Sequence, residues 1–167
     1  MKTVKRTAII LFILFSCVGC DQVTKSMARQ SLSGIGRISF FNDTFRLQYA
    51  ENPGAFLSLG ARIPENLRFW VFTLLVAAFL VGFSIYLIRS KRIDILQTVA
   101  LALIVGGGFG NLIDRVFNEG RVVDFLNLGI GALRTGIFNV ADIAITFGVA
   151  WLLILSVTKR EHSETVS

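Results

Sequence analysis

Two of the six aspartates, Asp124 and Asp142, stand among apolar residues, in the segments "RVVDFLNLG" and "FNVADIAI". An ionised carboxylate is costly in an apolar environment, so each of them needs a partner or a function. If the fold brings the two together in a low dielectric, both cannot ionise, and they share one proton. Such a pair can act on a carbonyl group. One carboxylate takes a proton from water while the protonated partner donates to the carbonyl oxygen.

Simpler interpretations of these aspartates remain open at this point. Asp142 follows Asn139 by three residues, a spacing suited to capping the start of a helix, where a carboxylate also favours the helix dipole. Asp124 could end a strand or a loop. Asp43, in the turn-like "FNDT", and Asp94, after a basic cluster, are expected to be solvated.

The two other aspartates have basic residues close by in the sequence. Asp21 is followed four residues later by Lys25, a helical spacing that lets the two charges neutralise each other. Asp114 adjoins Arg115, which suggests a carboxylate kept ionised as an organising group. Both pairs are therefore expected to support a site rather than to react.

Other kinds of site have little support in the sequence. His162 is the only histidine and lies in a polar tail, so serine or cysteine catalysis with a histidine base is not expected. Cys17 and Cys20 have no further Cys or clustered His to complete a metal site and are expected to be small buried apolar residues. The segment "GGGFGN", 106–111, lacks the lysine of a phosphate loop; small residues at 106 and 110 suit close helix packing instead.

Four stretches are long and apolar enough to cross a membrane. The chain has 167 residues, 53% of them hydrophobic, with 15 Phe and a mean hydropathy of +0.66. Lipid is therefore expected to be its main solvent, with a single domain over residues 1–167. A spanning helix needs about 20 apolar residues. The expected spans are residues 8–28, 69–88, 95–113 and 137–158.

The basic residues indicate the orientation of these spans. Eight of the 17 flank apolar runs: Lys2, Lys5, Arg6, Arg89, Lys91, Arg92, Lys159 and Arg160. No basic stripe alternates with exposed aromatic residues, so the net charge of +6 does not indicate a nucleic-acid partner. With four spans, both termini then face the cytoplasm, and segments 29–68 and 114–136 lie outside. Segment 37–60 alternates polar and apolar residues and contains an Asn-Pro-Gly turn, which predicts short strands or a hairpin on the membrane surface.

The first span has a second interpretation. Basic residues followed by "TAIILFILFSCVGC" are also typical of a secretory signal peptide, and "LFSC" and "VGC" resemble the cleavage site of a bacterial lipoprotein. The mature chain would then begin at Cys17 or Cys20. Because "DQVTKSMARQ" can extend the helix to about Ala28 and three further spans follow, an uncleaved first span is favoured.

Five segments, in order along the chain, resemble those of signal peptidase II, the lipoprotein signal peptidase family of bacterial inner membranes. They are "DQVTK" at 21–25, "NPGAF" at 52–56, "GGGFGNLIDR" at 106–115, "VVDF" at 122–125 and "FNVAD" at 138–142. Any one of these motifs alone would be weak, but together they cover residues from about 8 to 158.

This resemblance implies a fold, an activity and a set of site residues. The family has four transmembrane helices and a small extracytoplasmic β-cradle, and it cleaves prolipoproteins before their lipid-modified cysteine as an intramembrane aspartic endopeptidase. The catalytic aspartates match Asp124 and Asp142. The residues around the dyad and the substrate match Asn52, Gly54, Asn111, Asp114, Arg115 and Asn139, and the first-helix motif matches Asp21 and Lys25. Asn111 and Asn139 would orient the carboxylates, and Arg115 would hold Asp114 or a substrate carbonyl.

The resemblance also implies that no cofactor or metal is needed. The expected partners are prolipoprotein substrates and membrane lipids, and the protein is expected to be a monomer of the bacterial inner membrane with its active site near the outer face. In the loop at Asn52 the family usually has two small residues between the glycine and the phenylalanine. Here only Ala55 separates Gly54 from Phe56. The rival interpretation is a non-catalytic four-helix membrane protein, such as an assembly factor or transporter subunit.

Overall fold

The computed structural model describes residues 3–53, 64–90 and 92–164 of the chain. In order, its elements are α1 (Thr3–Leu32), β1 (Arg37–Phe40), β2 (Phe45–Asn52), α2 (Glu65–Arg89), α3 (Ile95–Phe117), β3 (Val122–Ile130), β4 (Leu133–Arg134) and α4 (Val140–Glu164). All four of these helices are long and apolar enough to cross a membrane. The predicted class, four membrane-spanning helices with a small antiparallel sheet, is therefore confirmed.

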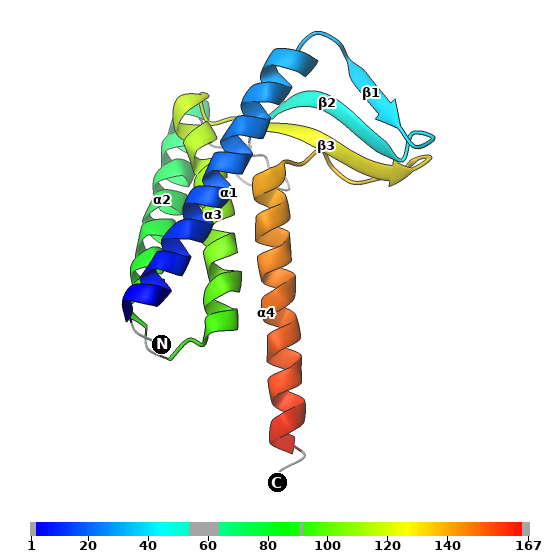
Figure 1. The fold of residues 1–167 in the computed structure, drawn as a ribbon. Coiled ribbons are helices and arrows are strands. Elements are labelled where there is room, and N and C mark those ends of the chain that lie inside the picture. The colour runs from blue at the N-terminus through cyan, green and yellow to red at the C-terminus, as the bar shows by residue number, and fades with distance from the viewer. Residues whose placement is uncertain (1–2, 54–63, 91, 165–167) are drawn as a thin grey trace.

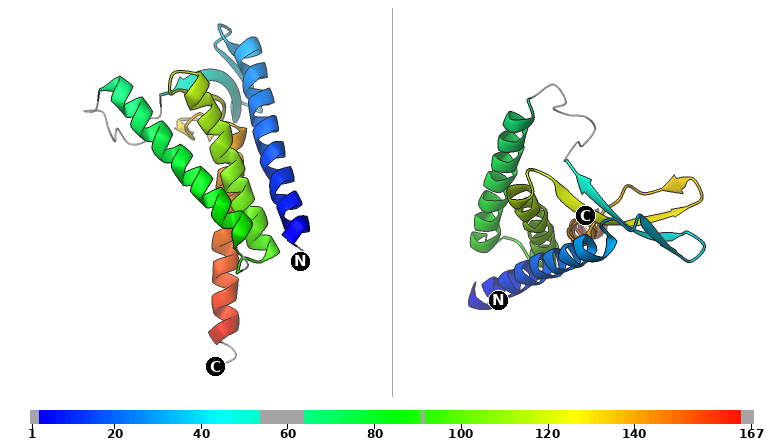
Figure 2. Two further views of the ribbon diagram at one scale, coloured as in Figure 1. Left: turned by 90° about the vertical axis from the view of Figure 1, so that its left-hand side faces the viewer. Right: turned by 90° about the horizontal axis from the view of Figure 1, so that it is seen from above.

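The helices run alternately up and down, and the sheet lies at one end of them (Figure 1). Both described ends of the chain lie at the opposite end, as the left-hand view of Figure 2 also shows. Helix α3 is the central element, because it packs against α1, α2 and α4. Residues 21–25 of α1, the last turns of α3 and the first turn of α4 meet beside the sheet.

The helix boundaries depart from the expected spans at several ends. Helix α1 continues to Leu32, and α3 continues to Phe117, so Asp114 lies in a helix rather than in an external loop. Helix α3 begins with a capping box in which the Asp94 side chain accepts from the backbone N–H of Gln97 and the Gln97 side chain accepts from the backbone N–H of Asp94. Asp94 is exposed, as expected, and in addition it caps this helix.

Small residues bring the first and third helices close together, as expected from positions 106 and 110. A Cβ added at Gly106 would lie 2.8 Å from the Cβ of Cys17. One added at Gly110 would lie 2.7 Å from a carboxylate oxygen of Asp21. Side chains at these positions would force α1 away from α3, so the glycines allow a polar group of α1 to reach the interface.

The sheet joins segments far apart in the sequence. Its order is β1-β2-β3-β4, with all neighbours antiparallel, and Ala50 of β2 pairs with Asp124 of β3. The predicted hairpin is present at Arg37–Asn52. Residues 54–60 of the same predicted segment lie outside the described residues. Asp124 is the third residue of a nine-residue strand, so the interpretation that it ends a strand or loop is wrong.

The turn between β1 and β2 is held by ion pairs. Asp43 accepts from the Ser39 hydroxyl and from the guanidinium of Arg46. The Nη1 atom of Arg134 lies 3.7 Å from Oδ2 of Asp43. The Arg46 hydrogen bond keeps the pKa of Asp43 well below its usual range. Asp43 is therefore a paired carboxylate and not simply a solvated one.

Helix α1 passes through both cysteines without a break. The Arg6 guanidinium donates to the backbone carbonyls of Leu87 and Ser90 at the end of α2. The first half of α1 is thus attached to the rest of the fold. Cys17 is partly buried, but Cys20 is exposed, so the expectation that both cysteines are buried is wrong for Cys20.

Candidate active site

A single asparagine joins the two predicted reactive carboxylates. Asp124 is 3% exposed on β3, and Asp142 is half-buried in the first turn of α4. The side-chain Nδ2 of Asn139 donates to Asp124 Oδ1 at 2.7 Å, and its backbone N–H donates to Asp142 Oδ2 at 3.1 Å. Residues 18 positions apart in the sequence therefore meet at one fully buried asparagine.

Each carboxylate has a second donor on its other oxygen. Asn111 Nδ2 of α3 donates to Asp142 Oδ1 at 2.9 Å. Asn52 Nδ2, at the end of β2, donates to Asp124 Oδ2 at 3.1 Å. All four carboxylate oxygens thus accept an N–H bond, an arrangement that favours a negative charge on the pair and holds both groups in place.

Opposing effects act on Asp124. Burial raises its pKa above the ordinary aspartate value, the hydrogen bonds from Asn52 and Asn139 lower it, and the nearby charge of Asp142 raises it again, with the net effect upward. A carboxyl group with a raised pKa keeps its proton at a higher pH. This is the property expected of the acid member of a pair.

The capping interpretation of Asp142 is also correct. The backbone N–H of Asp142 donates to Asn139 Oδ1 at 3.0 Å, and Asp142 Oδ2 accepts from the Asn139 backbone N–H in return. This reciprocal pair begins α4. It occupies only one oxygen of Asp142, however, and the bond from Asn111 to the other oxygen is not explained by capping.

A buried ammonium group holds the side chains that surround the carboxylate pair. Lys25 is 3% exposed, and its Nζ lies 2.7 Å from Asp21 and 3.2 Å from Asp114. The ion pair expected from the spacing of Asp21 and Lys25 is therefore present. Lys25 Nζ also donates to Asn111 Oδ1 at 2.9 Å. Because this oxygen also accepts from Asn139 at 3.0 Å, the Asn111 amide must turn its NH₂ group toward Asp142.

The two supporting aspartates each attach a backbone segment that carries a reactive one. Asp114 Oδ2 accepts from the backbone N–H of Val123 at 2.8 Å, next to Asp124. Asp21 Oδ1 accepts from the backbone N–H of Ala141 at 2.9 Å, next to Asp142. Removing either carboxylate would therefore loosen the strand or helix that holds its neighbour.

Arg115 acts on Asp114 through its charge, while the ion-pair partner of Asp114 is another residue. Asp114 is paired with Lys25, which comes from α1 and could not be identified from adjacent residues in α3. Within the described part of the chain, no ion pair joins Arg115 to Asp114. The charge of the Arg115 guanidinium interacts most strongly with Asp142, and less strongly with Asp124 and Asp114. Its charge therefore acts on the carboxylate pair.

Sequence reasoning missed Gln22. Its Nε2 donates to Asp114 Oδ1 at 3.0 Å and to the Gly110 carbonyl at 3.1 Å. The feature of the sequence that could have identified Gln22 is its polar side chain inside an apolar span. Gly54, predicted to shape the site, and Phe56 lie outside the described residues, so only Asn52 of that loop has a place in the site.

No group of three His, Cys, Asp or Glu side chains suited to a metal occurs among the residues that the structure describes. The oxygens of Asp124 and Asp142 instead meet amide donors. The arrangement therefore suits proton transfer between a buried acid and a base at the sheet end of the helices.

Comparisons with known proteins identify the family of the chain. A family model described as "Signal peptidase (SPase) II" matches residues 13–158. Proteins named lipoprotein signal peptidase match at 35% identity over 144 residues in Syntrophus aciditrophicus (85% of this chain, 88% of that protein) and at 34% over 165 residues in Borrelia hermsii (94% and 92%). A solved bacterial membrane enzyme has a TM-score of 0.69 at 26% identity, over 90% of this chain and 91% of the other.

Proposed function

The chain belongs to the signal peptidase II family, and from this membership we propose that it removes the signal peptide from lipid-modified bacterial prolipoproteins by cutting before the diacylglyceryl cysteine. One observation carries the aspartic mechanism. Asn139 holds Asp124 and Asp142 together at the end of membrane-spanning helices. A peptide bond at the boundary of the membrane could therefore meet both carboxyl groups.

We infer the following reaction. The pair carries one proton between its two carboxyl groups. The ionised group takes a proton from a water molecule, the water oxygen attacks the scissile carbonyl carbon, and the protonated group donates to the carbonyl oxygen. The resulting tetrahedral gem-diol collapses when the C–N bond breaks. The carboxyl group that took the proton from water donates it to the leaving nitrogen, and the other carboxylate takes a proton from a gem-diol hydroxyl, which restores the shared proton. The products are the free signal peptide and the lipoprotein with a new amino terminus.

The other side chains orient this pair. Asn111 and Asn139 keep the carboxylates in a fixed position, and Asn52 donates to Oδ2 of Asp124. Arg115 supplies a positive charge that can stabilise negative charge in the transition state. Gly54 is proposed to continue the loop beside the substrate.

We propose that a single chain is the working unit and that residues 1–167 form one domain. The proposal is supported by the origin of the site, since α1, α3, α4 and two strands of the same chain supply every contact described above. Membrane lipids are the expected surroundings of the four helices.

We propose that the protein lies in the bacterial inner membrane with both termini in the cytoplasm and the carboxylate pair near the outer face. The basic clusters at the helix ends opposite the sheet support this orientation. Reporter fusions after Arg92 and Ser167 are expected to report a cytoplasmic position, and fusions at Asn42 and Gly131 an external one. A cytoplasmic report at Asn42 would contradict the orientation.

A second prediction concerns pH. The active form carries one proton, so kcat/KM should follow a bell-shaped curve whose limbs belong to the pair. The basic limb reports loss of that proton, and the raised pKa of Asp124 should place it above the ordinary aspartate value. The Asn52 hydrogen bond lowers the pKa of Asp124, so Asn52→Ala should move the basic limb to higher pH.

The measurement is kcat/KM against pH for the wild type, Asn52→Ala and a control, Ser39→Ala. Ser39 donates to Asp43, outside the site, so its removal should leave both limbs in place. A basic limb that moves to lower pH in Asn52→Ala would contradict the role assigned to this hydrogen bond.

The experiment that tests the proposed function uses purified protein and a diacylglyceryl-modified prolipoprotein, with cleavage followed as a gel shift. The expected product lacks the signal peptide and begins at the lipidated cysteine. An assembly factor or transporter subunit would leave the substrate uncut. The same prolipoprotein without its lipid is the control and should be cut poorly.

A further inference from the structure

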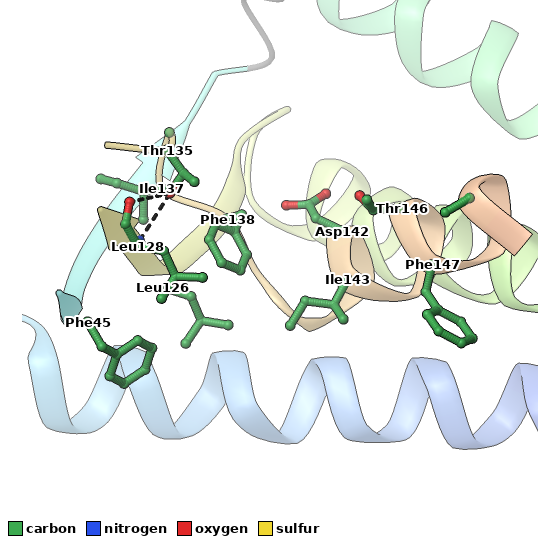
Figure 3. A pocket seen from close by; sticks show the side chains of 12 residues that line it. Phe45, Leu126, Leu128, Thr135, Ile137, Phe138, Asp142, Ile143, Thr146 and Phe147 are labelled. Carbon is green, nitrogen blue, oxygen red and sulfur yellow. Dashed lines mark hydrogen bonds between the residues drawn. The ribbon is translucent and has the colours of Figure 1, made fainter. Parts of the chain in front are cut away.

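An apolar groove begins at one of the two reactive carboxylates. It has a volume of about 800 Å³ and lies between the sheet and one side of α4 (Figure 3). The sheet side and the following segment contribute Phe45, Leu126, Leu128 and Phe138, and α4 contributes Ile143 and Phe147. Asp142 lines the same groove, so a substrate bound at the carboxylate pair would have an apolar channel directly beside it.

Along α4, the groove extends from Asp142 into the part of the helix that is apolar enough to lie in the hydrocarbon layer. Thr146 and Ala150 line it one and two turns beyond Asp142, which is about 6 and about 12 Å along the helix axis at 1.5 Å per residue. Ile143 is 48% exposed and Phe147 53% exposed, so the α4 wall is accessible from the lipid side. The groove therefore connects the site with the membrane interior.

We propose that this groove holds one acyl chain of the substrate's diacylglyceryl cysteine. This inference rests on the proposed function. Cleavage before that cysteine means that the cysteine itself supplies the scissile nitrogen, so its side chain lies beside the carboxylate pair, and the attached chain must turn back into the membrane. The groove offers that path, because it extends from the sheet along α4.

The chemistry of the lining favours an acyl chain over the signal peptide as the occupant. A peptide near its cleavage point exposes backbone N–H and C=O groups that need partners in lipid. The lining is almost wholly apolar, and the Thr135 hydroxyl already bonds to the backbone of Leu128. A saturated chain has no polar groups to satisfy. Because lipid is as apolar as the groove, the groove should act chiefly by positioning the cysteine.

The test is a pair of variants that narrow the groove at two depths, Thr146→Phe and Ala150→Phe. Their cleavage rates are compared on otherwise identical prolipoproteins carrying dihexanoyl, didecanoyl or dipalmitoyl glycerol. Ala150→Phe should slow the dipalmitoyl substrate about tenfold and spare the dihexanoyl one, since only the longer chain reaches that depth. Thr146→Phe, nearer to Asp142, should also slow the didecanoyl substrate.

Val149→Phe is the matched control, because Val149 is exposed at the same depth of α4 but does not line the groove. It should leave the chain-length profile unchanged. Phe147→Ala should widen the groove and raise the relative rate for substrates with branched acyl chains. This variant tests the groove without adding a larger side chain to it. Membrane abundance and melting temperature are measured for each variant.

Several results would overturn the assignment. They are an equal effect of the narrowing variants on all chain lengths, no effect from any groove variant, or a new dependence on the length of the signal peptide rather than of the acyl chains. The last result would place the signal peptide in the groove. Failure of the wild-type protein to cut any lipidated substrate would refute the proposed function instead, so the two failures are distinguishable.

Discussion

Asp124→Asn and Asp142→Asn are each expected to lower kcat by about 10⁴-fold or more, the loss typical of removing one member of a catalytic unit. Asparagine has nearly the shape of aspartate but can neither take a proton from water nor hold the shared one. The fold should survive both substitutions. Asparagine is accepted in the first turn of a helix, and its carbonyl oxygen can still receive the Asn139 N–H that starts α4. The measurement is cleavage of a lipidated prolipoprotein at matched membrane abundance.

The matched control is Asp43→Asn, the same chemical change in the turn between β1 and β2. Asp43 contacts Ser39, Arg46 and Arg134 and has no contact with the carboxylate pair. Its substitution should leave kcat near the wild-type value. If Asp142 served only as a cap, Asp142→Asn would be equally mild, and that outcome would contradict the proposed role.

Lys25→Met is expected to lower the free energy of unfolding by about 3–5 kcal/mol, the cost typical of removing one partner of a buried ion pair. The methionine keeps the apolar stem but leaves Asp21 and Asp114, which are 0% and 6% exposed, without their cation. Activity should fall as well, because Asn111 loses one of the donors that fix its amide. Thermal and denaturant unfolding of the purified protein in detergent give the stability.

Two further variants show whether the unpaired charge is the cause. Lys5→Met removes an exposed lysine of the same helix and should leave the unfolding free energy unchanged. Lys25→Met combined with Asp114→Asn removes a buried charge together with its counter-ion and should recover part of the loss. An unfolding free energy equal to that of the wild type in Lys25→Met alone would show that the buried network contributes little.

Local patterns predicted much of this molecule. Uninterrupted apolar runs are sufficient to identify membrane helices, because lipid requires every backbone group to be paired within the segment. The four-residue spacing of Asp21 and Lys25 predicted an ion pair that is present, and the three-residue spacing of Asn139 and Asp142 predicted a cap that is also present. These contacts depend only on helix geometry.

Contacts between distant segments were less accessible. Lys25 and Asp114 are 89 positions apart and meet because α1 and α3 pack closely at glycines, which no local pattern reveals. Segment 122–130 was expected only as part of an external loop. It forms a strand because residues 45–52 pair with it, and its buried residues do not alternate with exposed ones along the first half.

The resemblance identified side chains that spacing could not select. Asn52 and Asn111 are ordinary polar residues in the sequence, yet each donates to one of the two carboxylates. Arg115 was expected to hold Asp114 or a substrate carbonyl, and its charge acts on Asp142 and Asp124 as well as on Asp114. On a helix, adjacent residues point in different directions, so adjacency was a poor guide there.

The central claim is that Asp124 and Asp142 act as one proton-sharing unit. The most direct test is kcat of the double variant Asp124→Asn with Asp142→Asn, compared with each single variant at matched membrane abundance. If neither carboxyl group can work alone, the double variant should be scarcely slower than either single one. Wild-type cleavage by either single variant, or losses that multiply in the double variant, would contradict the claim.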